Sequence, residues 1–244
     1  MTDVLHKRAL VTGGSGDIGA AICRRLARDG YFVYVHANRS AAVAETLAEE
    51  IVAGGGQAQA LCFDITDAKA AEAAIETALH EGPIQILVNN AGIHDDAVFP
   101  AMNAEQWHGV IDVSVTGFFN VTRPLMLPMI RTRWGRIVNT SSVAALIGNR
   151  GQVNYAAAKG ALNSATKALA LEVATRGITV NAIAPGVIAT AMSEKTFDEE
   201  TIARIVPMKR AGSPAEVAGL VSYLVSDEAG YVTAQIISIS GGMA

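Results

Sequence analysis

The sequence contains no apolar run of 18 residues, only two cysteines and no stretch rich in lysine and arginine. The first absence excludes a membrane-spanning helix, and the polar residues 1–8 lack the apolar segment of a signal peptide. Cys23 and Cys62 each lie in an apolar segment, which predicts reduced core residues of a cytoplasmic protein and neither a disulfide nor a metal site. A formal net charge of −4 without a basic stripe argues against nucleic acid as a partner.

Short apolar segments alternate with longer segments of helical periodicity along the chain. Strands are predicted at 8–12, 31–36, 58–63, 84–88, 136–140, 179–183 and 235–240. Helices are predicted at 17–29, 41–53, 68–80, 104–131, 153–175 and 214–226. We expect the helix at 104–131 to bend near its two prolines, and the polar stretch 192–205 to be a mobile excursion. Repeated βα units predict an α/β fold, with a single doubly wound parallel sheet (Rossmann-like) and helices on both faces.

A glycine-rich turn follows the first predicted strand. Its sequence Thr12-Gly13-Gly14-Ser15-Gly16-Asp17-Ile18-Gly19 contains a GxGxxG match between a strand and a helix. Glycines let backbone N–H groups approach a pyrophosphate, and the helix N-terminus adds partial positive charge; a purely structural turn is the alternative. Because no linker or repeat is present, we expect residues 1–244 to form a single dinucleotide-binding domain. Its first candidate cofactor-binding residues are Gly13, Ser15, Gly16, Asp17, Ile18 and Gly19.

The end of the second predicted strand indicates which dinucleotide binds. An NAD enzyme usually has an acidic residue here, which holds the ribose 2′-hydroxyl. This sequence instead has His36-Ala37-Asn38-Arg39-Ser40, with one guanidinium and no carboxylate. Arg39 would attract a 2′-phosphate, and Asn38 and Ser40 would supply further donors, so the pattern predicts NADP(H). The alternative is that Arg39 is a solvated loop charge.

The third and fourth predicted strands also end in residues suited to a ligand. Asp64-Ile65 follows one strand and Asn89-Asn90-Ala91-Gly92 follows the next. Open α/β sheets bind ligands at the carboxyl ends of their strands. The further candidate cofactor-binding residues are therefore Asp64, Ile65, Asn90, Ala91 and Gly92, although an asparagine such as Asn90 also caps turns.

Ser142, Tyr155 and Lys159 form the most informative group in the sequence. Tyr155 and Lys159 are four residues apart in a predicted helix and share one face, and Ser142 ends the preceding strand. A tyrosine with a pKa of about 10 is a poor proton donor near neutral pH, and a neighbouring ammonium lowers that pKa. An isolated Tyr-Lys pair is more often a solvated helix face. The glycine-rich turn upstream favours a catalytic site.

These residues occur in the order seen in the short-chain dehydrogenases/reductases. The chain resembles that family at TGxxxxxG (12–19), NNAG (89–92), Ser142, YxxxK (155–159) and PGxxxT (185–190), over essentially its whole length. Within the family it looks most like the 3-oxoacyl-[acyl-carrier-protein] reductases, in segments 148–159, 176–181 and 241–243. It is also similar to reductases associated with aryl polyene synthesis, which have a similar serine at position 114.

The resemblance implies NADPH-dependent reduction of a 3-oxoacyl thioester on an acyl carrier protein, in fatty acid or aryl polyene synthesis. Tyr155 is the implied general acid, Ser142 would hydrogen-bond the ketone oxygen, and Lys159 would bind the nicotinamide ribose and lower the pKa of Tyr155. Tyr155 and Lys159 are thus implied cofactor contacts as well. The loop after the sixth strand would hold the carboxamide through Thr190 and the backbone of Ile188. The implied cofactor-binding residues of that loop are Pro185, Gly186, Ile188 and Thr190.

The sequence departs from the family pattern at two places, the glycine-rich turn and position 114. Asp17 replaces the middle glycine of TGxxxGxG, and its charge would weaken pyrophosphate binding. Gly16 replaces a residue that is often an arginine for the 2′-phosphate, which leaves more to Arg39. Ser114, included among the catalytic residues, stands where many members have an asparagine that holds a water of the proton relay. Since serine reaches less far, we expect a rebuilt relay or a reduced turnover.

The substrate mouth is expected from residues 94–100, 144–152 and 192–205. We interpret His94, Asp95 and Asp96 in that region as solvated loop residues and expect no metal.

An acidic carrier protein needs local positive charge to dock. Arg131, Arg133 and Arg136 cluster around Trp134, and Arg133 and Arg176 match the family's docking positions. Helix-end arginines that complement the helix dipole are the alternative. The resemblance also implies a homodimer or homotetramer, formed through the helices at 104–131 and 153–175.

Two other functions stay open. One is a small-molecule alcohol, sugar or steroid dehydrogenase, against which segment 148–153 argues. The other is a non-catalytic cofactor-binding subunit of a hetero-oligomer, which the departures at Asp17 and Ser114 favour. Acyl chain length, carrier protein against coenzyme A, and the direction of the reaction are not readable in the sequence.

Overall fold

The computed structural model describes residues 7–191 and 198–244. Its centre is a seven-stranded sheet in the order β3-β2-β1-β4-β5-β6-β7, in which every neighbouring pair is parallel. The strands are β1 (Arg8–Val11), β2 (Phe32–Ala37), β3 (Gln57–Cys62), β4 (Ile84–Asn89), β5 (Gly135–Thr140), β6 (Ile178–Pro185) and β7 (Ile236–Ile239). The predicted fold, a doubly wound parallel sheet, is confirmed. The single domain stays a prediction.

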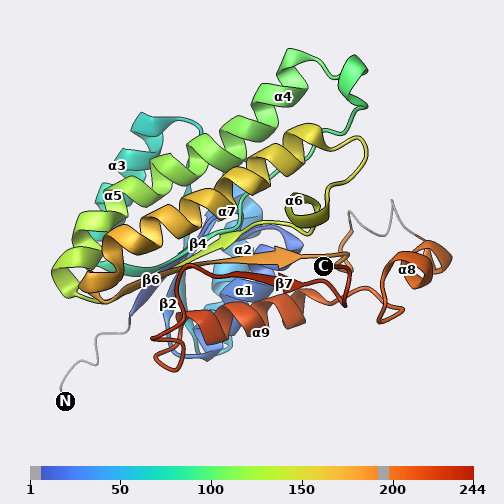
Figure 1. Ribbon diagram of the computed structural model, residues 1–244. Coiled ribbons are helices and arrows are strands. Elements are labelled where there is room, and N and C mark those ends of the chain that lie inside the picture. The colour runs from blue at the N-terminus through green and yellow to red at the C-terminus, as the bar shows by residue number, and fades with distance from the viewer. Residues whose placement is uncertain (1–6, 192–197) are drawn as a thin grey trace.

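Helices cover both faces of the sheet (Figure 1). One layer contains α1 (Asp17–Arg28), α2 (Ala41–Ala53) and α9 (Pro214–Val225). The other contains α3 (Ala68–Leu79), α4 (Ala104–Ile111), α5 (Gly117–Thr132) and α7 (Val153–Val173). Successive residues of β1 enter opposite cores, with Val11 under the first layer and Leu10 under the second. This two-sided burial explains why the strands are continuously apolar.

The predicted helix at 104–131 is wrong in one respect. The helix is interrupted by a π-helical turn, η2 (Asp112–Thr116), and α5 then runs through both Pro124 and Pro128. The irregularity therefore lies before the prolines. At this turn the Ser114 side chain is buried, and Gly117 lies so close to Ile65 that a Cβ would come within 2.6 Å of its Cδ1. Such single π-turns are frequent at functional sites.

The carboxyl ends of the strands gather several short elements. These are η1 (Phe99–Ala101), α6 (Ala144–Ile147) and α8 (Glu199–Ile205), and Figure 1 shows α6 and α8 at the same end of the molecule. Within the polar stretch 192–205, α8 is helical, with the Asp198 carboxylate as its N-cap. Residues 192–197 of that stretch lie outside the described part of the chain. A last short element, η3 (Ala174–Arg176), follows α7 at the opposite end.

Two predictions made from the apolar segments have different outcomes. Cys23 is buried as expected, but Cys62 is exposed. The reason is that β3 is an edge strand in which partly buried and solvent-exposed side chains alternate. Over the described residues, no helix is both long and apolar enough to cross a bilayer.

Candidate active site

Three side chains from β5 and α7 converge at the carboxyl end of the sheet. Ser142 follows β5, and Tyr155 and Lys159 lie in the first two turns of α7. The Nζ atom of Lys159 is 5.7 Å from the centroid of the Tyr155 ring, and the Ser142 hydroxyl is a hydrogen-bond partner of the Tyr155 phenol. The predicted common face of Tyr155 and Lys159 is therefore present.

Lys159 is a buried cation. Its side chain is 2% exposed, and Nζ donates to the carbonyl of Thr140 at 2.8 Å. Burial lowers its pKa from 10.5 to about 8. A Cβ on Gly92 would lie 2.9 Å from Nζ, so glycine at position 92 leaves the ammonium its space.

The pKa of Tyr155 departs from the expectation. Burial of the phenol raises its pKa above 10, the hydrogen bond with Ser142 acts to lower it, and the charge of Asp96 raises it further. The net shift is opposite to the expected one, because desolvation of the phenol outweighs the hydrogen bond with Ser142. The effect of Lys159 on this pKa stays a prediction.

The glycine-rich turn is tightly built around Gly13. Gly13 has a φ of 63°, its N–H donates to Nδ1 of His36 at 3.0 Å, and its carbonyl accepts from the N–H of Gly16 at 3.1 Å. Gly19 packs against the same carbonyl, since a Cβ there would lie 2.1 Å from the Gly13 oxygen. Positions 13 and 19 therefore require glycine, while Ile18 packs partly into the core beneath the turn.

Asn90 joins this turn to the loop after β4. Its Nδ2 donates to the carbonyls of Thr12 at 3.1 Å and Gly13 at 3.3 Å. The N–H groups of Asn90 and Ala91 both donate to the Thr12 hydroxyl, at 2.9 and 3.0 Å. Thr12 was not among the predicted site residues, although a hydroxyl at the end of a strand is a signal for hydrogen bonding to a neighbouring loop.

The ends of β2 and β3 meet beside the turn. Asn38, Arg39 and Ser40 are exposed. Hydrogen bonds from Thr66 lower the pKa of Asp64 most, and a hydrogen bond from Asn38 and the Arg39 charge lower it further. The side chain of Ile65 is buried against Gly117, so only its backbone is available to a ligand.

A groove of about 840 Å³ is lined by the turn, by the loop after β6, and by residues of α1, α2 and the start of α9; Ser142, Tyr155 and Lys159 lie outside it. Ser15, Gly16 and Asp17 line one side, and 189–191 line the other. The carboxylate of Asp17 crosses the groove and accepts from the N–H of Ala191 at 3.0 Å. The predicted Thr190 faces this groove.

Other residues of the loop after β6 hold it in place. The Pro185 carbonyl accepts from the N–H of Val143 at 2.9 Å. Gly186 donates to the carbonyl of Ile239 at 3.0 Å, and Ile188 is buried in a parallel bridge with Gly212. These contacts position the loop at the carboxyl edge of the sheet.

Ser114 is buried beneath the site. The residue is 2% exposed, and its hydroxyl has no hydrogen-bond partner within residues 7–191 and 198–244. It lines a cavity of about 10 Å³ with Thr12, Asn89 and Ala91, among other residues. That space corresponds to roughly one water molecule.

The polar residues at the substrate mouth are more ordered than expected. Asp96 accepts from Nε2 of Gln152 at 2.8 Å and lies 3.4 Å from Nδ1 of His94, while Asp95 accepts from Gln106 at 2.7 Å. They are exposed, yet the Asp96 charge reaches Tyr155. The described residues contain no cluster of three His, Cys, Asp or Glu able to hold a metal.

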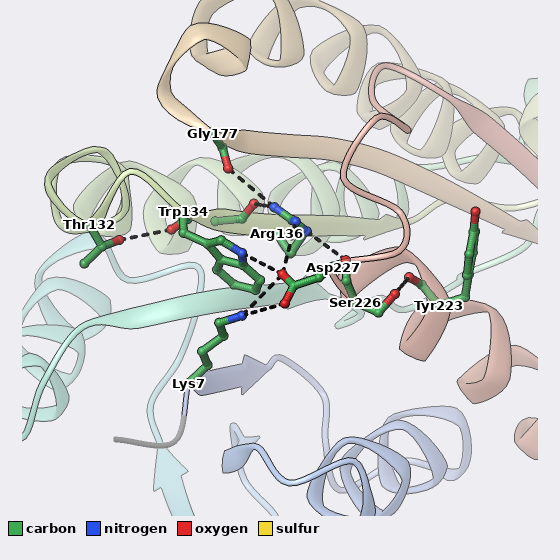
Figure 2. A network of polar contacts seen from close by, with 9 residues as sticks. Lys7, Thr132, Trp134, Arg136, Gly177, Tyr223, Ser226 and Asp227 are labelled. Atoms are coloured by element: carbon green, nitrogen blue, oxygen red, sulfur yellow. Dashed lines mark hydrogen bonds and ion pairs between the residues drawn. The ribbon is translucent and has the colours of Figure 1, made fainter. Parts of the chain in front are cut away.

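Arg136 lies against Trp134 but is buried, so it adds no exposed positive charge to the expected docking cluster. Arg136 is 4% exposed and donates to the carbonyls of Gly135 at 2.9 Å, Ser226 at 3.3 Å and Gly177 at 3.4 Å. Figure 2 shows this network, in which Asp227 also accepts from the indole of Trp134 at 2.9 Å. The guanidinium is thus hydrogen-bonded within the fold and is not available to a partner protein.

Arg133 and Arg176 are exposed and lie together at the amino end of the sheet. Arg133 ends α5 with a φ of 52°, and Arg176 ends η3. A Cβ on Gly177 would come within 2.3 Å of the Arg133 carbonyl, so the two loops touch. Tyr155 lies near the other end of α7, about 27 Å from the helix end at Val173 at 1.5 Å per residue.

Comparisons with known proteins support this arrangement. The family model described as short chain dehydrogenase matches residues 7–201. A 3-oxoacyl-[acyl-carrier-protein] reductase of Synechocystis sp. is 42% identical over 245 residues, which cover 100% of this chain and 99% of the relative. The 3-oxoacyl-[acyl-carrier-protein] reductase FabG of Aggregatibacter actinomycetemcomitans is 42% identical over 241 residues, covering 98% and 100%. Nodulation protein G of Azospirillum brasilense is 46% identical over 250 residues, covering 98% of each.

Proposed function

We propose that this chain, which belongs to the short-chain dehydrogenase family, is an oxidoreductase of the 3-oxoacyl-[acyl-carrier-protein] reductase type. We propose NADPH as its cofactor. The observation that carries the proposal is the convergence of Ser142, Tyr155 and Lys159 at the carboxyl end of a doubly wound sheet. The names of the relatives support a 3-oxoacyl thioester as substrate. The cytoplasm stays the predicted location.

The glycine-rich turn and the loop after β4 fit a nicotinamide dinucleotide. The backbone is bare at Gly13 and Gly92, where a Cβ would lie 3.0 Å from Cα of Ala91 and 2.9 Å from Nζ of Lys159. The N-terminus of α1 adds N–H groups and partial positive charge behind the turn. Ser15, Gly16 and Thr190 would hold the dinucleotide in the groove. When bound, the cofactor supplies a hydride to the carbonyl carbon.

The chain's own residues would supply the proton. Because burial raises the pKa of Tyr155, the phenol is protonated at neutral pH and available as an acid. Ser142 would donate a hydrogen bond to the carbonyl oxygen, and Tyr155 would transfer its proton to that oxygen, which gives the 3-hydroxyacyl product and a phenolate. With a pKa of about 8, Lys159 is largely charged at pH 7 and would stabilise that phenolate.

Ser114 would connect this site to a proton supply. Its hydroxyl has no partner in the described chain and faces a cavity with room for about one water. A water there would replace the function of the longer asparagine side chain of other family members. Ser114→Ala should lower kcat and steepen its pH dependence, whereas Ser114→Asn should retain activity; equal kcat and pH profiles in all three proteins would remove Ser114 from the relay.

Arg39 supports the choice of NADPH over NADH. It is exposed beside Asn38 and Asp64 at the ends of β2 and β3, where its charge already acts on Asp64. A charge-assisted hydrogen bond contributes about 1.5–3 kcal/mol. Arg39→Ala should therefore reduce the ratio of kcat/KM for NADPH over NADH by roughly 10–100-fold. An unchanged ratio would reject the assignment of the 2′-phosphate site, with Arg28→Ala on α1 as the control.

The outer faces of α5 and α7 support a dimer. They expose Phe119 (57%), Leu127 (63%) and Leu171 (79%), and small residues such as Gly160 and Ala168 lie beside them on α7. Apolar and small residues let helices from two subunits pack closely. We propose a homodimer through these faces, with a tetramer as the larger alternative. Leu127→Glu with Leu171→Glu should give monomers in sedimentation.

Such a dimer would explain how carrier docking at Arg133 and Arg176 serves catalysis. These arginines lie beyond the opposite end of α7, which is itself about 27 Å from Tyr155 of their own chain. A twofold axis that sets the α7 helices antiparallel would bring them to the catalytic site of the partner subunit. The helix-dipole role stays the alternative.

Mixed dimers test docking across the interface. One subunit carries Arg133→Glu and Arg176→Glu, and the other carries Tyr155→Phe, so that neither homodimer is active on a carrier-bound substrate. If docking works across the interface, the mixed dimer regains about half of the wild-type activity per dimer, from its one intact site. If docking works within one chain, the mixed dimer stays inactive. If the homodimer with Arg133→Glu and Arg176→Glu retains carrier-dependent activity, these arginines do not dock the carrier.

The direct test of the reaction follows NADPH absorbance at 340 nm with purified protein. A 3-oxoacyl thioester should be reduced much faster than a free ketone, sugar or steroid, because segment 148–153 matches the thioester reductases. Saturated and polyene acyl chains, on carrier protein and on coenzyme A, define the substrate further. Turnover only of free ketones would favour the small-molecule dehydrogenase. NADPH binding without any turnover would favour a non-catalytic subunit.

A further inference from the structure

We propose that His36 is a positioning residue that fixes the shape of the glycine-rich turn. This proposal rests on the proposed function in one respect: the glycine-rich turn binds the cofactor. His36 is the penultimate residue of β2 and is 2% exposed. His36 takes no part in the chemistry described above, and a polar ring is buried only where its nitrogens have hydrogen-bond partners.

Both ring nitrogens of His36 are engaged, and the contacts fix its tautomer. The N–H of Gly13 donates to Nδ1 at 3.0 Å, so Nδ1 carries no proton. The proton is therefore on Nε2, which donates to the carbonyl of Phe63 at 3.0 Å. The imidazole also packs edge-on against the Phe63 ring, with centroids 4.4 Å apart and an interplanar angle of 62°. His36 is thus a neutral bridge from the turn after β1 to the end of β3.

Gly13 is the residue of the turn that most needs such a bridge. Its φ of 63° is a left-handed conformation, and its carbonyl is held by Gly16 and by Asn90. β1 lies between β2 and β4 in the sheet. His36 from β2 and Asn90 from the loop after β4 therefore hold the two polar groups of Gly13 from opposite sides.

Loss of the bond to His36 would leave the Gly13 N–H without its acceptor. A buried N–H without a partner is costly, so the peptide would reorient toward another acceptor. Ser15 and Gly16, two and three residues on, line the groove and would move with it. Burial lowers the pKa of His36 to about 4, so the ring stays neutral and the bridge intact near neutral pH.

Two isosteric substitutions separate the two bonds. In His36→Asn the amide oxygen takes the place of Nδ1 and still accepts from Gly13. In His36→Gln the amide nitrogen takes the place of Nε2 and still donates to Phe63, but Gly13 loses its acceptor. We expect the Kd for NADPH, measured by fluorescence, to stay within about twofold of wild type for His36→Asn and to rise about tenfold for His36→Gln.

The kinetic split distinguishes positioning from general damage. Both variants should keep kcat at saturating NADPH, because the turn contacts the cofactor and not the reacting carbonyl. The control is Thr179→Val, which removes a buried polar group far from the turn, at the amino end of β6, and should leave the Kd unchanged. Equal Kd values for the Asn and Gln variants would overturn the proposal.

Hydrogen–deuterium exchange in the absence of cofactor gives an independent readout. Peptides covering residues 12–19 should exchange faster in His36→Gln than in wild type and His36→Asn. This result holds even if the wild type binds no NADPH, in which case the proposed function fails and the bridge stands. If His36→Gln does not fold, the ¹⁵N shifts of the wild-type ring decide, since a proton found on Nδ1 would contradict the bridge.

Discussion

Two buried cations at opposite ends of β5 have very different surroundings. Arg136, at the amino end, is 4% exposed and is satisfied by three carbonyls and by Asp227, whose Oδ1 lies 3.8 Å from its Nη2 (Figure 2). It also stacks on the Trp134 indole, which Lys7 contacts as well, at 4.3 and 3.8 Å from the ring centroid. Lys159, at the carboxyl end, is 2% exposed and donates to the single carbonyl of Thr140.

The contrast separates a structural charge from one kept for chemistry. Within the described residues, no carboxylate lies within ion-pair distance of Lys159, although a full set of partners is what normally permits a buried charge. Two buried hydroxyls near it, those of Ser114 and Thr140, also have no partner in the part of the chain described. Because the Thr179 hydroxyl at the amino end of β6 also lacks a partner among the described residues, it is the buried Lys159 ammonium with its single acceptor that indicates a site which a ligand completes.

The largest effect on folding is expected for Arg136→Met. It removes hydrogen bonds from three carbonyls and the cation over Trp134, and it leaves those acceptors buried. The free energy of unfolding in urea should fall by about 2–4 kcal/mol at pH 7, while NADPH turnover per folded molecule is retained. A loss below about 0.5 kcal/mol would mean that Arg136 is as poorly compensated as Lys159.

Lys159→Met should act in the opposite direction on stability. The folded-state pKa of about 8 lies below the ordinary 10.5, so folding disfavours the charged lysine below pH 8, and this penalty disappears as pH rises from 8 to 10.5. The substitution should stabilise the cofactor-free protein by about 1–3 kcal/mol at pH 7 and abolish activity. The stabilisation should shrink by pH 10. Destabilisation at pH 7 would show that the ammonium is a structural group after all.

His36 should give the smallest of these effects, seen only in acid. Its folded-state pKa of about 4 lies below the ordinary 6.5, so its stabilisation is complete above pH 6.5 and is lost as pH falls toward 4. At pH 5 the wild type should have lost about 2 kcal/mol through this residue, which His36→Asn should not lose. Parallel urea titrations at pH 7 and pH 5 measure the difference, and equal losses would contradict a buried neutral ring.

Much of this fold was predictable from local patterns, because strands buried on both faces are continuously apolar and helices are periodic. The grouping of Ser142, Tyr155 and Lys159 was also predictable, since helix spacing and strand ends determine it. The π-turn at 112–116 was not, because it depends on the packing of Gly117 against Ile65, which are 52 residues apart. The burial of Arg136 was hidden for the same reason, since its partners include the turn before β6 and the loop after α9.

The direction of the Tyr155 pKa was beyond the sequence as well. A neighbouring ammonium can be read from spacing, but the desolvation of the phenol and the approach of Asp96 depend on the assembled cleft. The structure therefore leaves the phenol a protonated acid until a bound substrate and cofactor change its surroundings.

The central claim is that the Tyr155 phenol gives its proton to the carbonyl oxygen. Its most direct test is the rate of NADPH loss with a 3-oxoacyl thioester for wild type and Tyr155→Phe, which removes the hydroxyl and keeps the ring. The account predicts that Tyr155→Phe binds NADPH with a Kd close to wild type but loses about 10²–10⁴-fold in kcat/KM. Retention of more than about a tenth of the wild-type rate would contradict it.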